Sequence, residues 1–427
     1  MGVAMAAGAA DPYGREGLQL ADARTRVLDA IQQGTTRRAQ AFIETVPLAD
    51  ALERVNAAAV LARADVPGFR ASIMDGYALG QSQQPAVEDT WTLVGRSAPA
   101  APYPTVLAHG EAIRILTGAP LPEGADWVLP QELVQKVNDS LCLKQEASAN
   151  PWIRPANEEC SQGSTLLMPG QRLGLADLAQ AASCGVQQLN VYRQPRIGLL
   201  ISGDELVSPG EQRPEGAIWE SNSTLLKSLL KRLGYQAWDC RVVADQPQVL
   251  RKTIVELSSS CDVLVSTGGV SAGDSDWIRP LMTELGEVEF WKLFLKPGRP
   301  FAFGCVGDNV PFFGLPGNPV AAAVTALQLL WPALQLLEGQ QEPELLPRLR
   351  VSLETPYRRR PGRPELARAS LVCSGDGELR ARVDGSQASS RIGSLQNADL
   401  LLEIPAESGD LERGDQLWAQ LLRRRLL

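Results

Sequence analysis

Asp-Val-Leu-Val-Ser-Thr-Gly-Gly-Val-Ser-Ala-Gly-Asp-Ser-Asp, from Asp262 to Asp276, is the stretch that decides the fold. Its apolar, β-branched beginning predicts a buried strand of a parallel sheet. Gly268 and Gly269 then allow a sharp turn and a close approach of the backbone to a ligand. Ser271 and Asp276 are residue types that cap helices, and a helical pattern follows. The stretch therefore predicts a strand, a glycine turn and a helix N-terminus.

Such a turn suits anion binding, because backbone N–H groups at a helix N-terminus can hold a phosphate. The carboxylates of Asp274 and Asp276 would repel a bare phosphate. We therefore favour a divalent cation that bridges these carboxylates to the phosphate. The alternative is a purely structural turn between a strand and a helix, with an aspartate cap.

Composition limits the classes of function. The 427 residues exceed one ordinary core, which predicts roughly two to four domains. A net charge of −8 argues against general nucleic-acid binding, which needs a basic surface. The seven cysteines include no C-x-x-C pair, so neither a zinc site nor a disulfide framework is expected. The single histidine, His109, excludes metal motifs that need two histidines.

Two segments bear on localisation. Residues 1–17 lack the basic start and long apolar core of a signal peptide, so we expect a disordered tail. The apolar run from Val320 to Leu337 is interrupted by Gln328, Pro332 and Gln335, which favours a buried helix over a membrane span. Free thiols also fit a reducing compartment, so we expect a cytoplasmic chain without a membrane segment.

The first half of the chain mixes helical and strand patterns. Helical spacing predicts one helix over Leu20 to Ile31, a second over Leu48 to Ala59, and a third around Leu175 to Ala182 that packs with the first two. Short strands and a hairpin turning at Asn138 to Ser140 are expected between them. These patterns predict a helical linker domain from residues 18–57 plus 162–194, and a β-rich domain from residues 58–161.

Strands and helices alternate regularly over residues 195–340. This alternation predicts a mostly parallel α/β sheet, whose ligands lie beyond the carboxyl ends of its strands. Three polar segments fall at such ends, namely Ser202 to Glu205, Asp245, and Gly268 to Asp276. Asn222 is expected to cap the helix that follows it.

The end of the chain adds a further turn and a small domain. The Pro316-Gly317-Asn318 turn stands between a strand and a helix, which gives another geometry suited to anions. Short alternating runs over residues 341–427 predict an all-β domain, either a barrel or a sandwich.

Basic residues cluster locally in this acidic chain. Lys292, Lys296 and Arg299 lie among aromatic residues, and Arg358 to Arg360 stand close to Arg363. Both clusters suit a small anion, although solvated surface charge is an alternative interpretation for the Arg358 run.

Six motifs in order resemble the molybdopterin molybdenumtransferase family, or MoeA family, which includes the E domains of gephyrin-like proteins. They are VPGFRASIMDGYA (66–78), TGAPLPEGAD (117–126), SGDEL (202–206), TGGVSAGDSD (267–276), FWKLFLKPGRP (290–300) and GLPGNPV (314–320). The resemblance covers the chain from about Leu20 to its end. It implies a multidomain α/β protein with a three-layer molybdopterin-binding domain, similar to that of molybdopterin adenylyltransferase, and a small C-terminal β-barrel.

The resemblance implies an enzyme that inserts molybdate into adenylylated molybdopterin and releases AMP with the help of Mg²⁺. It implies Glu205 and Asp276 as Mg²⁺ ligands, because their hard oxygens suit this ion. Asp245 and Asp75 are implied as further catalytic carboxylates. Tungstate has nearly the same size and charge as molybdate, so the motifs fit either anion.

The resemblance also implies substrate-binding residues. Those expected to hold the pterin, its phosphate and the nucleotide are Thr117, Ser202, Gly203, Gly268, Gly269, Ser271, Pro316, Gly317 and Asn318. Those expected to hold the tetrahedral molybdate by charge and hydrogen bonds are Lys292, Lys296, Arg363 and Ser389.

Several positions depart from the family pattern. Arg299 replaces a lysine and keeps its charge, Ala321 replaces a frequent serine, and Glu159 replaces an aspartate. Two further departures are Gln387-Ala-Ser389 in place of Gln-Gly-Ser, and Ala398-Asp399 in place of Ala-Asn. These changes bear mainly on the molybdate site.

Relatives form two-fold dimers, which implies a homodimer whose cleft is shared between subunits. We expect Asp75 of one subunit to complete the cleft of the other. Molybdopterin adenylyltransferase and molybdoenzymes are possible protein contacts. Two other functions compete: an adenylyltransferase, which lacks the domains with MDGYA and TGAPLP, and a non-catalytic scaffold, which would not need carboxylates at Glu205, Asp245 and Asp276.

Overall fold

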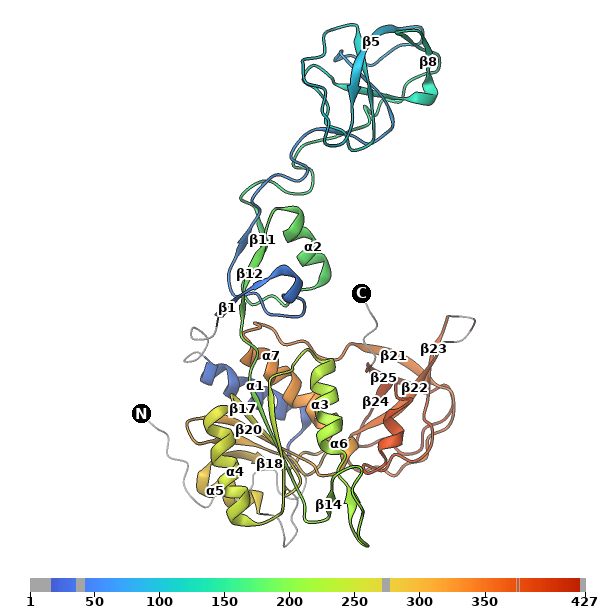
Figure 1. Cartoon of the computed structure of the whole chain (residues 1–427). Helices are drawn as coiled ribbons and strands as arrows, with labels where there is room; N and C mark the ends of the chain where they lie inside the picture. The colour runs from blue at the N-terminus through green and yellow to red at the C-terminus, as the bar shows by residue number, and fades with distance from the viewer. Residues whose placement is uncertain (1–16, 36–42, 271–276, 374, 376, 423–427) are drawn as a thin grey trace. The chain divides into compact units, whose positions relative to one another are not determined.

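The computed structural model describes residues 17–35, 43–270, 277–373, 375 and 377–422. Ser271 and Asp276, both predicted site residues, lie outside the described residues. The chain divides into two compact units, one formed by residues 1–44, 53–55 and 192–427, the other by residues 45–52 and 56–191 (Figure 1). Each unit is described by itself.

The larger unit is built on a six-stranded sheet. Its strand order is β16-β13-β17-β20-β19-β18. The first four are parallel to one another, and β19 pairs antiparallel with both β20 and the edge strand β18. In chain order the strands are β13 (Ile197–Ser202), β16 (Trp238–Val243), β17 (Val263–Thr267), β18 (Gly286–Trp291), β19 (Ala302–Val306) and β20 (Val310–Leu315). The mostly parallel sheet expected from the alternating pattern is confirmed.

Helices cover both faces of this sheet, which gives the three layers. On β13, Leu199 and Ile201 pack toward α1, α3 and the final helix, whereas Leu200 packs toward α4 and α5. Adjacent residues of a strand point to opposite faces, so a continuous apolar run is what a strand buried on both faces requires. The helices are α1 (Leu20–Thr35), α3 (Asn222–Arg232), α4 (Pro247–Ser260) and α5 (Ile278–Leu285).

The final helix of this domain is continuous and apolar. It consists of α6 (Pro319–Thr325), a π-helical segment (Ala326–Leu330) and α7 (Trp331–Leu337). Within the described residues it is long and apolar enough to cross a membrane, but 83% of its most apolar window is buried inside the protein. It is a core helix, as its interrupted apolar run predicts.

The C-terminal part of the larger unit is a closed barrel with the strand order β21-β23-β22-β24-β25. Its strands are β21 (Arg348–Leu353), β22 (Glu365–Cys373), β23 (Leu379–Arg382), β24 (Leu400–Ile404) and β25 (Gln416–Leu421). Small and branched apolar side chains such as Ala367, Ala369 and Leu402 fill its interior. This confirms the barrel and decides against the sandwich.

The smaller unit is β-rich. Its main sheet has the order β7-β4-β6-β5-β9-β8, in which β8 and β9 form the hairpin expected at Asn138 to Ser140. The strands are β4 (Gly76–Leu79), β5 (Thr90–Ser97), β6 (Glu111–Ile115), β7 (Trp127–Pro130), β8 (Val134–Val137) and β9 (Ser140–Leu143). Around it lie β1 (Ile43–Pro47), β2 (Val60–Leu61), β3 (Ala71–Ser72), β10 (Ile153–Arg154), β11 (Thr165–Leu167), α2 (Leu175–Ser183) and β12 (Gln188–Tyr192).

The helix predicted over Leu48 to Ala59 is wrong. Only a short 3-10 turn forms there, Leu48–Asp50, and Glu53 has a φ of 61°, which an α-helix does not allow. The Asn56 side chain donates to Met168 O, 112 residues away, so distant partners replace helical hydrogen bonds.

The predicted packing of the first helix against the third is also wrong. α1 buries its apolar face in the core of the α/β domain, whereas α2 packs with Leu167, Leu173 and Leu189 of the smaller unit. The proposed boundaries of the linker domain stay a prediction.

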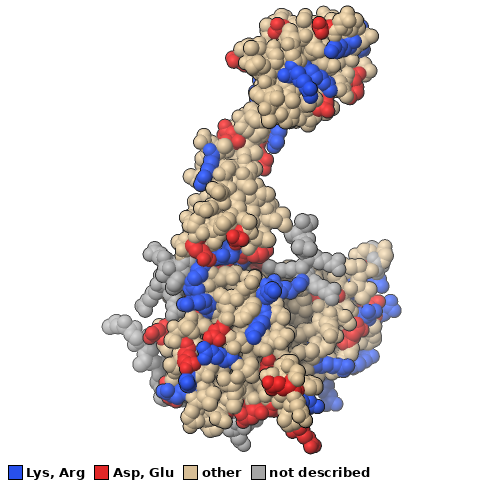
Figure 2. Space-filling view, in the orientation of Figure 1, with Lys and Arg blue, Asp and Glu red and all other residues tan. Residues whose placement is uncertain are grey.

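Charge on the surface is mixed. Figure 2 shows Lys and Arg side chains interspersed with Asp and Glu over the face in view, with no continuous basic surface on the atoms it describes. This distribution agrees with the net charge of −8.

Candidate functional site

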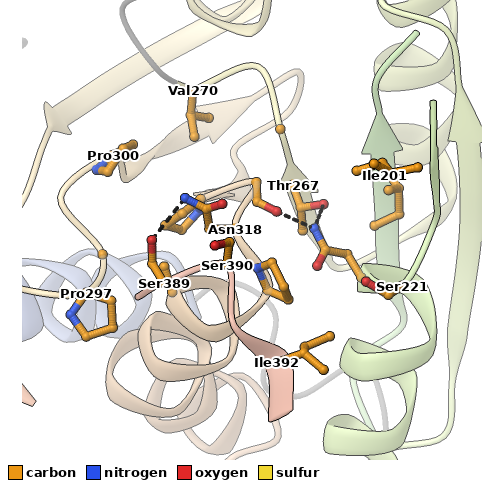
Figure 3. Close-up of a pocket in the computed structure, with 18 of the residues that line it drawn as sticks. Ile201, Ser221, Thr267, Val270, Pro297, Pro300, Asn318, Ser389, Ser390 and Ile392 are labelled. Atoms are coloured by element: carbon orange, nitrogen blue, oxygen red, sulfur yellow. Dashed lines mark hydrogen bonds between the residues drawn. The ribbon is translucent and has the colours of Figure 1, made fainter. Parts of the chain in front are cut away.

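A cavity of about 1200 Å³ opens at the carboxyl ends of the parallel strands, against the barrel (Figure 3). All of its lining residues belong to the larger unit. They include Ser202 and Glu205 after β13, Thr267 to Val270 after β17, Pro316 to Pro319 after β20, Lys296 to Pro300, and Gln387 to Ser390 from the barrel. Segments that are far apart in the sequence therefore meet at the edge of the sheet where ligands of such folds bind.

The glycine turn after β17 needs its glycines. Gly268 has a φ of +87°, and a Cβ atom built there would lie 2.6 Å from the backbone oxygen of Ser202. A Cβ on Gly317 would lie 3.5 Å from the Cα of Gly268, so the two loops approach within van der Waals contact. A Cβ on Gly203 would come within 2.7 Å of the Glu205 carboxylate, so the Glu205 side chain would have to move. A larger residue at Gly268 would therefore displace the Ser202 backbone.

Asn222 joins two of the loops, a role that the sequence analysis missed. Its side-chain amide donates to Thr267 Oγ1 at 3.3 Å and to the Gly317 oxygen at 2.8 Å (Figure 3). The helix cap that it was expected to supply comes instead from Glu220, whose carboxylate accepts bonds from the Ser223 N–H at 2.8 Å and from the Ser223 hydroxyl. In the sequence, the position of the polar Asn222 shortly after a strand was the available signal. That signal is compatible both with a helix cap and with a side chain that bridges loops.

The barrel closes one side of the cavity through Ser389. Asn318 donates from its amide to Ser389 Oγ at 3.0 Å, and the Val320 N–H donates to the Ser389 oxygen at 3.1 Å (Figure 3). The backbone N–H of Val320 is thus already used by the barrel. The Pro316-Gly317-Asn318 turn contributes shape to the cavity and holds the barrel loop.

The same side of the cavity is cationic. Lys296, Arg299 and Arg363 all line it. Burial lowers the pKa of Arg363, with a further contribution from Arg299 that Glu365 opposes. Arg363 also donates to the Leu295 oxygen at 3.0 Å, which fixes its side chain. Positive charges gathered on one wall of a cavity favour the binding of an anion there.

A buried carboxylate stands behind these cations. Glu365 is 1% exposed, and its Oε1 lies 2.9 Å from Lys296 Nζ. The Tyr357 hydroxyl donates to the same oxygen at 2.9 Å, and the Arg359 guanidinium lies 3.5 Å from the other oxygen. Burial raises the pKa of Tyr357, as does the adjacent Glu365, so the phenol stays protonated and donates. Glu365 therefore fixes the Lys296 ammonium at the cavity wall.

Arg368 supports the barrel loop that carries Ser389, and the sequence analysis missed it as well. Only 2% of the residue is exposed, and burial lowers its pKa. Its guanidinium donates to the Ala388 oxygen and to Ser394 Oγ, both at 3.2 Å. Its backbone N–H and oxygen pair with the Gln387 amide. It positions the loop that carries Ser389.

Lys292 does not line the cavity. Its backbone has a φ of 67°, its N–H donates to the Phe301 oxygen, and its oxygen accepts from the Leu18 N–H. The structure therefore separates Lys292 from Lys296, Arg363 and Ser389, the other residues predicted for molybdate.

Carboxylates gather beyond the end of β13. Glu205 lines the cavity, and Asp204 accepts the Asp245 N–H at 2.9 Å. Burial raises the pKa of Asp245, and the Asp204 and Glu205 carboxylates raise it further. The nearby Ser202 hydroxyl lowers the pKa of Asp245 in part, although Ser202 Oγ and Asp245 Oδ1 are not in hydrogen-bond geometry. Among the described residues, neither Ser202 Oγ nor Asp245 Oδ1 has a hydrogen-bond partner, although both are buried.

Asp75 and Thr117 lie together in the smaller unit. Asp75 Oδ1 accepts the Thr117 N–H at 2.7 Å and the Thr117 hydroxyl at 2.9 Å. These two bonds, together with the charge of Arg114, lower the pKa of the exposed Asp75 carboxyl. Asp75 is therefore ionised at neutral pH.

Three family models match successive parts of the chain. They are the MoeA N-terminal region (domains I and II) over residues 18–185, a probable molybdopterin binding domain over residues 198–336, and the MoeA C-terminal region (domain IV) over residues 350–422.

Individual relatives span nearly the whole chain. A molybdopterin molybdenumtransferase of Haemophilus influenzae is 31% identical over 93% of this chain and 97% of its own length. Molybdopterin molybdenumtransferase 2 of Mycobacterium tuberculosis is 32% identical over 87% of this chain and 93% of its own. A crystal structure of the molybdopterin biosynthesis MoeA protein of a Pyrococcus species superimposes with a TM-score of 0.75 and 25% identity, covering 96% of this chain and 100% of that one.

Proposed function

The chain belongs to the MoeA family of molybdopterin molybdenumtransferases, and we propose that its cavity inserts molybdate into adenylylated molybdopterin and releases AMP. The observation that carries this proposal is the meeting of two chemistries in one cavity. Glycine turns and carboxylates lie at the strand ends, and a cationic wall with Ser389 lies on the barrel side. A substrate that carries phosphates and receives an oxyanion needs both.

The cationic wall suits molybdate. Lys296 and Arg363 supply positive charge, and Ser389 supplies a hydroxyl, so together they can bind a tetrahedral dianion. We assign the direct contacts to these three residues. Lys292 receives a supporting role only, because it lies outside the lining. Molybdate is a substrate here, and tungstate would fit the same donors.

The strand ends suit the phosphates. Gly268, Gly269 and Gly317 allow the backbone to approach a ligand, and Ser202 can supply a hydroxyl donor. Thr117, which holds Asp75, is assigned to the cleft of the other subunit together with that carboxylate. Asp245 would position the water that attacks the phosphoanhydride. Its raised pKa suits a group that accepts a proton from this water.

We also propose a Mg²⁺ requirement. Ser202 and Glu205 line the cavity, whereas Asp245 lies behind this lining. The buried Ser202 Oγ and Asp245 Oδ1 lack partners among the described residues, so the donor set consists of hard oxygens. These residues fit Mg²⁺. Glu205 and Asp276 would hold the ion, with Asp276 outside the described residues. When bound, Mg²⁺ neutralises the charge that develops on the phosphates.

Assembly completes the proposal. We infer a cytoplasmic two-fold homodimer in which Asp75 of one subunit acts in the cleft of the other. Asp75 and the cavity belong to different units of the chain, and a two-fold interface would create two equivalent shared sites. Molybdopterin adenylyltransferase as supplier and molybdoenzymes as acceptors are the proposed protein contacts.

Mixing inactive variants tests the shared site. Asp75→Ala chains and Glu205→Ala chains are each expected to be inactive, but their heterodimers place both lesions in one site and leave the other intact. We expect activity to return after subunit exchange. If exchange is verified and activity stays at the level of the separate variants, the shared site is refuted.

The reaction is tested by mixing the purified chain with adenylylated molybdopterin, molybdate and Mg²⁺. We expect AMP by chromatography and a cofactor that activates a molybdenum-free molybdoenzyme. Adenylylation of molybdopterin by ATP would favour the adenylyltransferase alternative. Binding of all ligands without turnover would favour the scaffold.

A further inference from the structure

A half-exposed tryptophan borders the cavity, and the proposed reaction does not yet use it. Trp219 lines the cavity, yet 52% of the residue is exposed to solvent. Leaving so much apolar ring surface in water is unfavourable by roughly 25 cal/mol per Å². Large exposed aromatic surfaces beside a pocket often mark a place where a ligand binds.

The ring of Trp219 is held in place. Its Nε1–H donates to the Glu211 oxygen at 3.1 Å. The Arg213 guanidinium lies 5.2 Å from the ring centroid and is itself anchored, since it donates to the Ala217 oxygen at 2.7 Å. One face of the indole is thus covered by a fixed cation. A ring that is fixed before binding loses little side-chain entropy when a ligand stacks on it.

The backbone places this ring on the carboxylate side of the cavity. β15 (Ile218–Trp219) pairs with β14 (Leu206–Val207), and the Ile218 N–H donates to the Glu205 oxygen at 2.8 Å. Ser221, two residues after Trp219, lies across the cavity from Pro297 and Ser389 in Figure 3. The tryptophan therefore belongs to the phosphate side, opposite the cationic wall.

We propose that Trp219 is a binding residue that stacks against the adenine ring of the adenylylated substrate. The inference rests on the proposed function, which places phosphates beside Glu205 and molybdate beside Lys296 and Ser389. The adenosine lies beyond the phosphates, on the side away from molybdate. Stacking on aromatic rings tolerates any flat base, and Arg213 behind the indole extends the stack.

The test measures AMP binding by calorimetry with the full chain and Mg²⁺. We expect Trp219→Ala to weaken AMP binding about tenfold and Trp219→Phe to keep it within about threefold, because a phenyl ring still stacks. Ribose 5-phosphate, which has no base, should bind both variants as it binds the wild type. AMP should also quench tryptophan emission in the wild type, and this quench should vanish in Trp219→Phe while binding persists.

Trp418→Ala is the matched control. Trp418 is also an exposed tryptophan, 41% exposed, with Arg348 stacked at 4.7 Å, but it lies on β25 outside the cavity lining. We expect it to bind AMP like the wild type.

Several results would overturn the inference. Unchanged AMP binding in Trp219→Ala, equal loss of AMP and ribose 5-phosphate, or no AMP binding by the wild type would each do so. If only the pterin substrate loses affinity in Trp219→Ala, the ring stacks on the pterin and the adenine assignment is wrong. Failure of the proposed reaction would look different. In that case the wild type would bind AMP, Trp219→Ala would bind it less tightly, and the wild type would still release no AMP when given the substrates.

Discussion

Replacing Glu365 with glutamine tests how the cationic wall is held. The change removes a charge that is 1% exposed and keeps its shape. Removing one partner of a buried ion pair costs about 3–5 kcal/mol, because the other charge stays buried and unpaired. Two features reduce that figure here. The Lys296 side chain is 43% exposed, and Arg359 keeps three carbonyl acceptors, on Pro405, Ser408 and Arg363.

We therefore expect Glu365→Gln to lower the free energy of unfolding by about 2 kcal/mol, below the range for a fully buried pair. Because Lys296 loses its anchor, the KM for molybdate should rise about tenfold, equivalent to about 1.4 kcal/mol, with a smaller change in kcat. Urea denaturation and molybdate-dependent AMP release measure the two effects. Glu412→Gln is the control, since its pair with Arg358 is 61% and 62% exposed and should contribute less than about 1 kcal/mol.

The reasoning is refuted if Glu365→Gln unfolds like the wild type and keeps its KM for molybdate. Equal changes in Glu365→Gln and Glu412→Gln would also refute it, because the effect would then be one of net charge and not of a fixed Lys296.

Three other predictions follow from the site. Gly268→Ala should destabilise the fold by at least about 1 kcal/mol and weaken AMP binding, because its φ is positive and its Cβ would meet a backbone oxygen at 2.6 Å. Gly210→Ala is the control, since it has a positive φ but open space around it, so it should lose less stability and keep AMP binding. Asn222→Ala should reduce kcat/KM about tenfold with little change in helix content by circular dichroism, since its amide joins two loops and does not cap α3; loss of the helix signal would contradict this. Thr117→Val should raise the pKa of Asp75 toward its ordinary value in a ¹³C NMR titration, because the hydroxyl lowers it; the stabilisation from the ionised carboxylate is present above the unfolded pKa and is lost as pH falls through the folded pKa, so an unchanged pKa would contradict the contact.

The sequence predicts the sheet well, because a strand that is buried on both faces requires a continuous run of apolar residues, which is easy to recognise. β13 and β17 are apolar along most of their length and become polar only at their carboxyl ends, beside the cavity. Glycine is needed where Gly268 passes within reach of the Ser202 oxygen. The helix expected over Leu48 to Ala59 failed because its apolar spacing also suits an irregular segment that packs on distant strands. Tertiary contacts decided between these structures.

The polar support of the cavity was much harder to predict. Arg368 alternates with Ala367 and Ala369 of the barrel core, so it lies on the outer face of β22, where the loop of Ala388 and Ser394 buries it. The strand pattern alone does not predict that a loop covers this face. Asn222 has the residue type and position of a helix cap, but Glu220 accepts the N–H hydrogen bond at the start of the helix. Such roles depend on neighbours that only the folded chain brings together.

One measurement tests the central claim most directly. In a single turnover with excess enzyme, adenylylated molybdopterin and molybdate, AMP release and molybdenum insertion are followed together, in the wild type and in Glu205→Gln. The proposal of one cavity with both chemistries predicts one AMP for each molybdenum inserted, and a loss of both in Glu205→Gln by at least about tenfold, about 1.4 kcal/mol in barrier. Molybdenum insertion at the wild-type rate in Glu205→Gln, or insertion without AMP release, would contradict it.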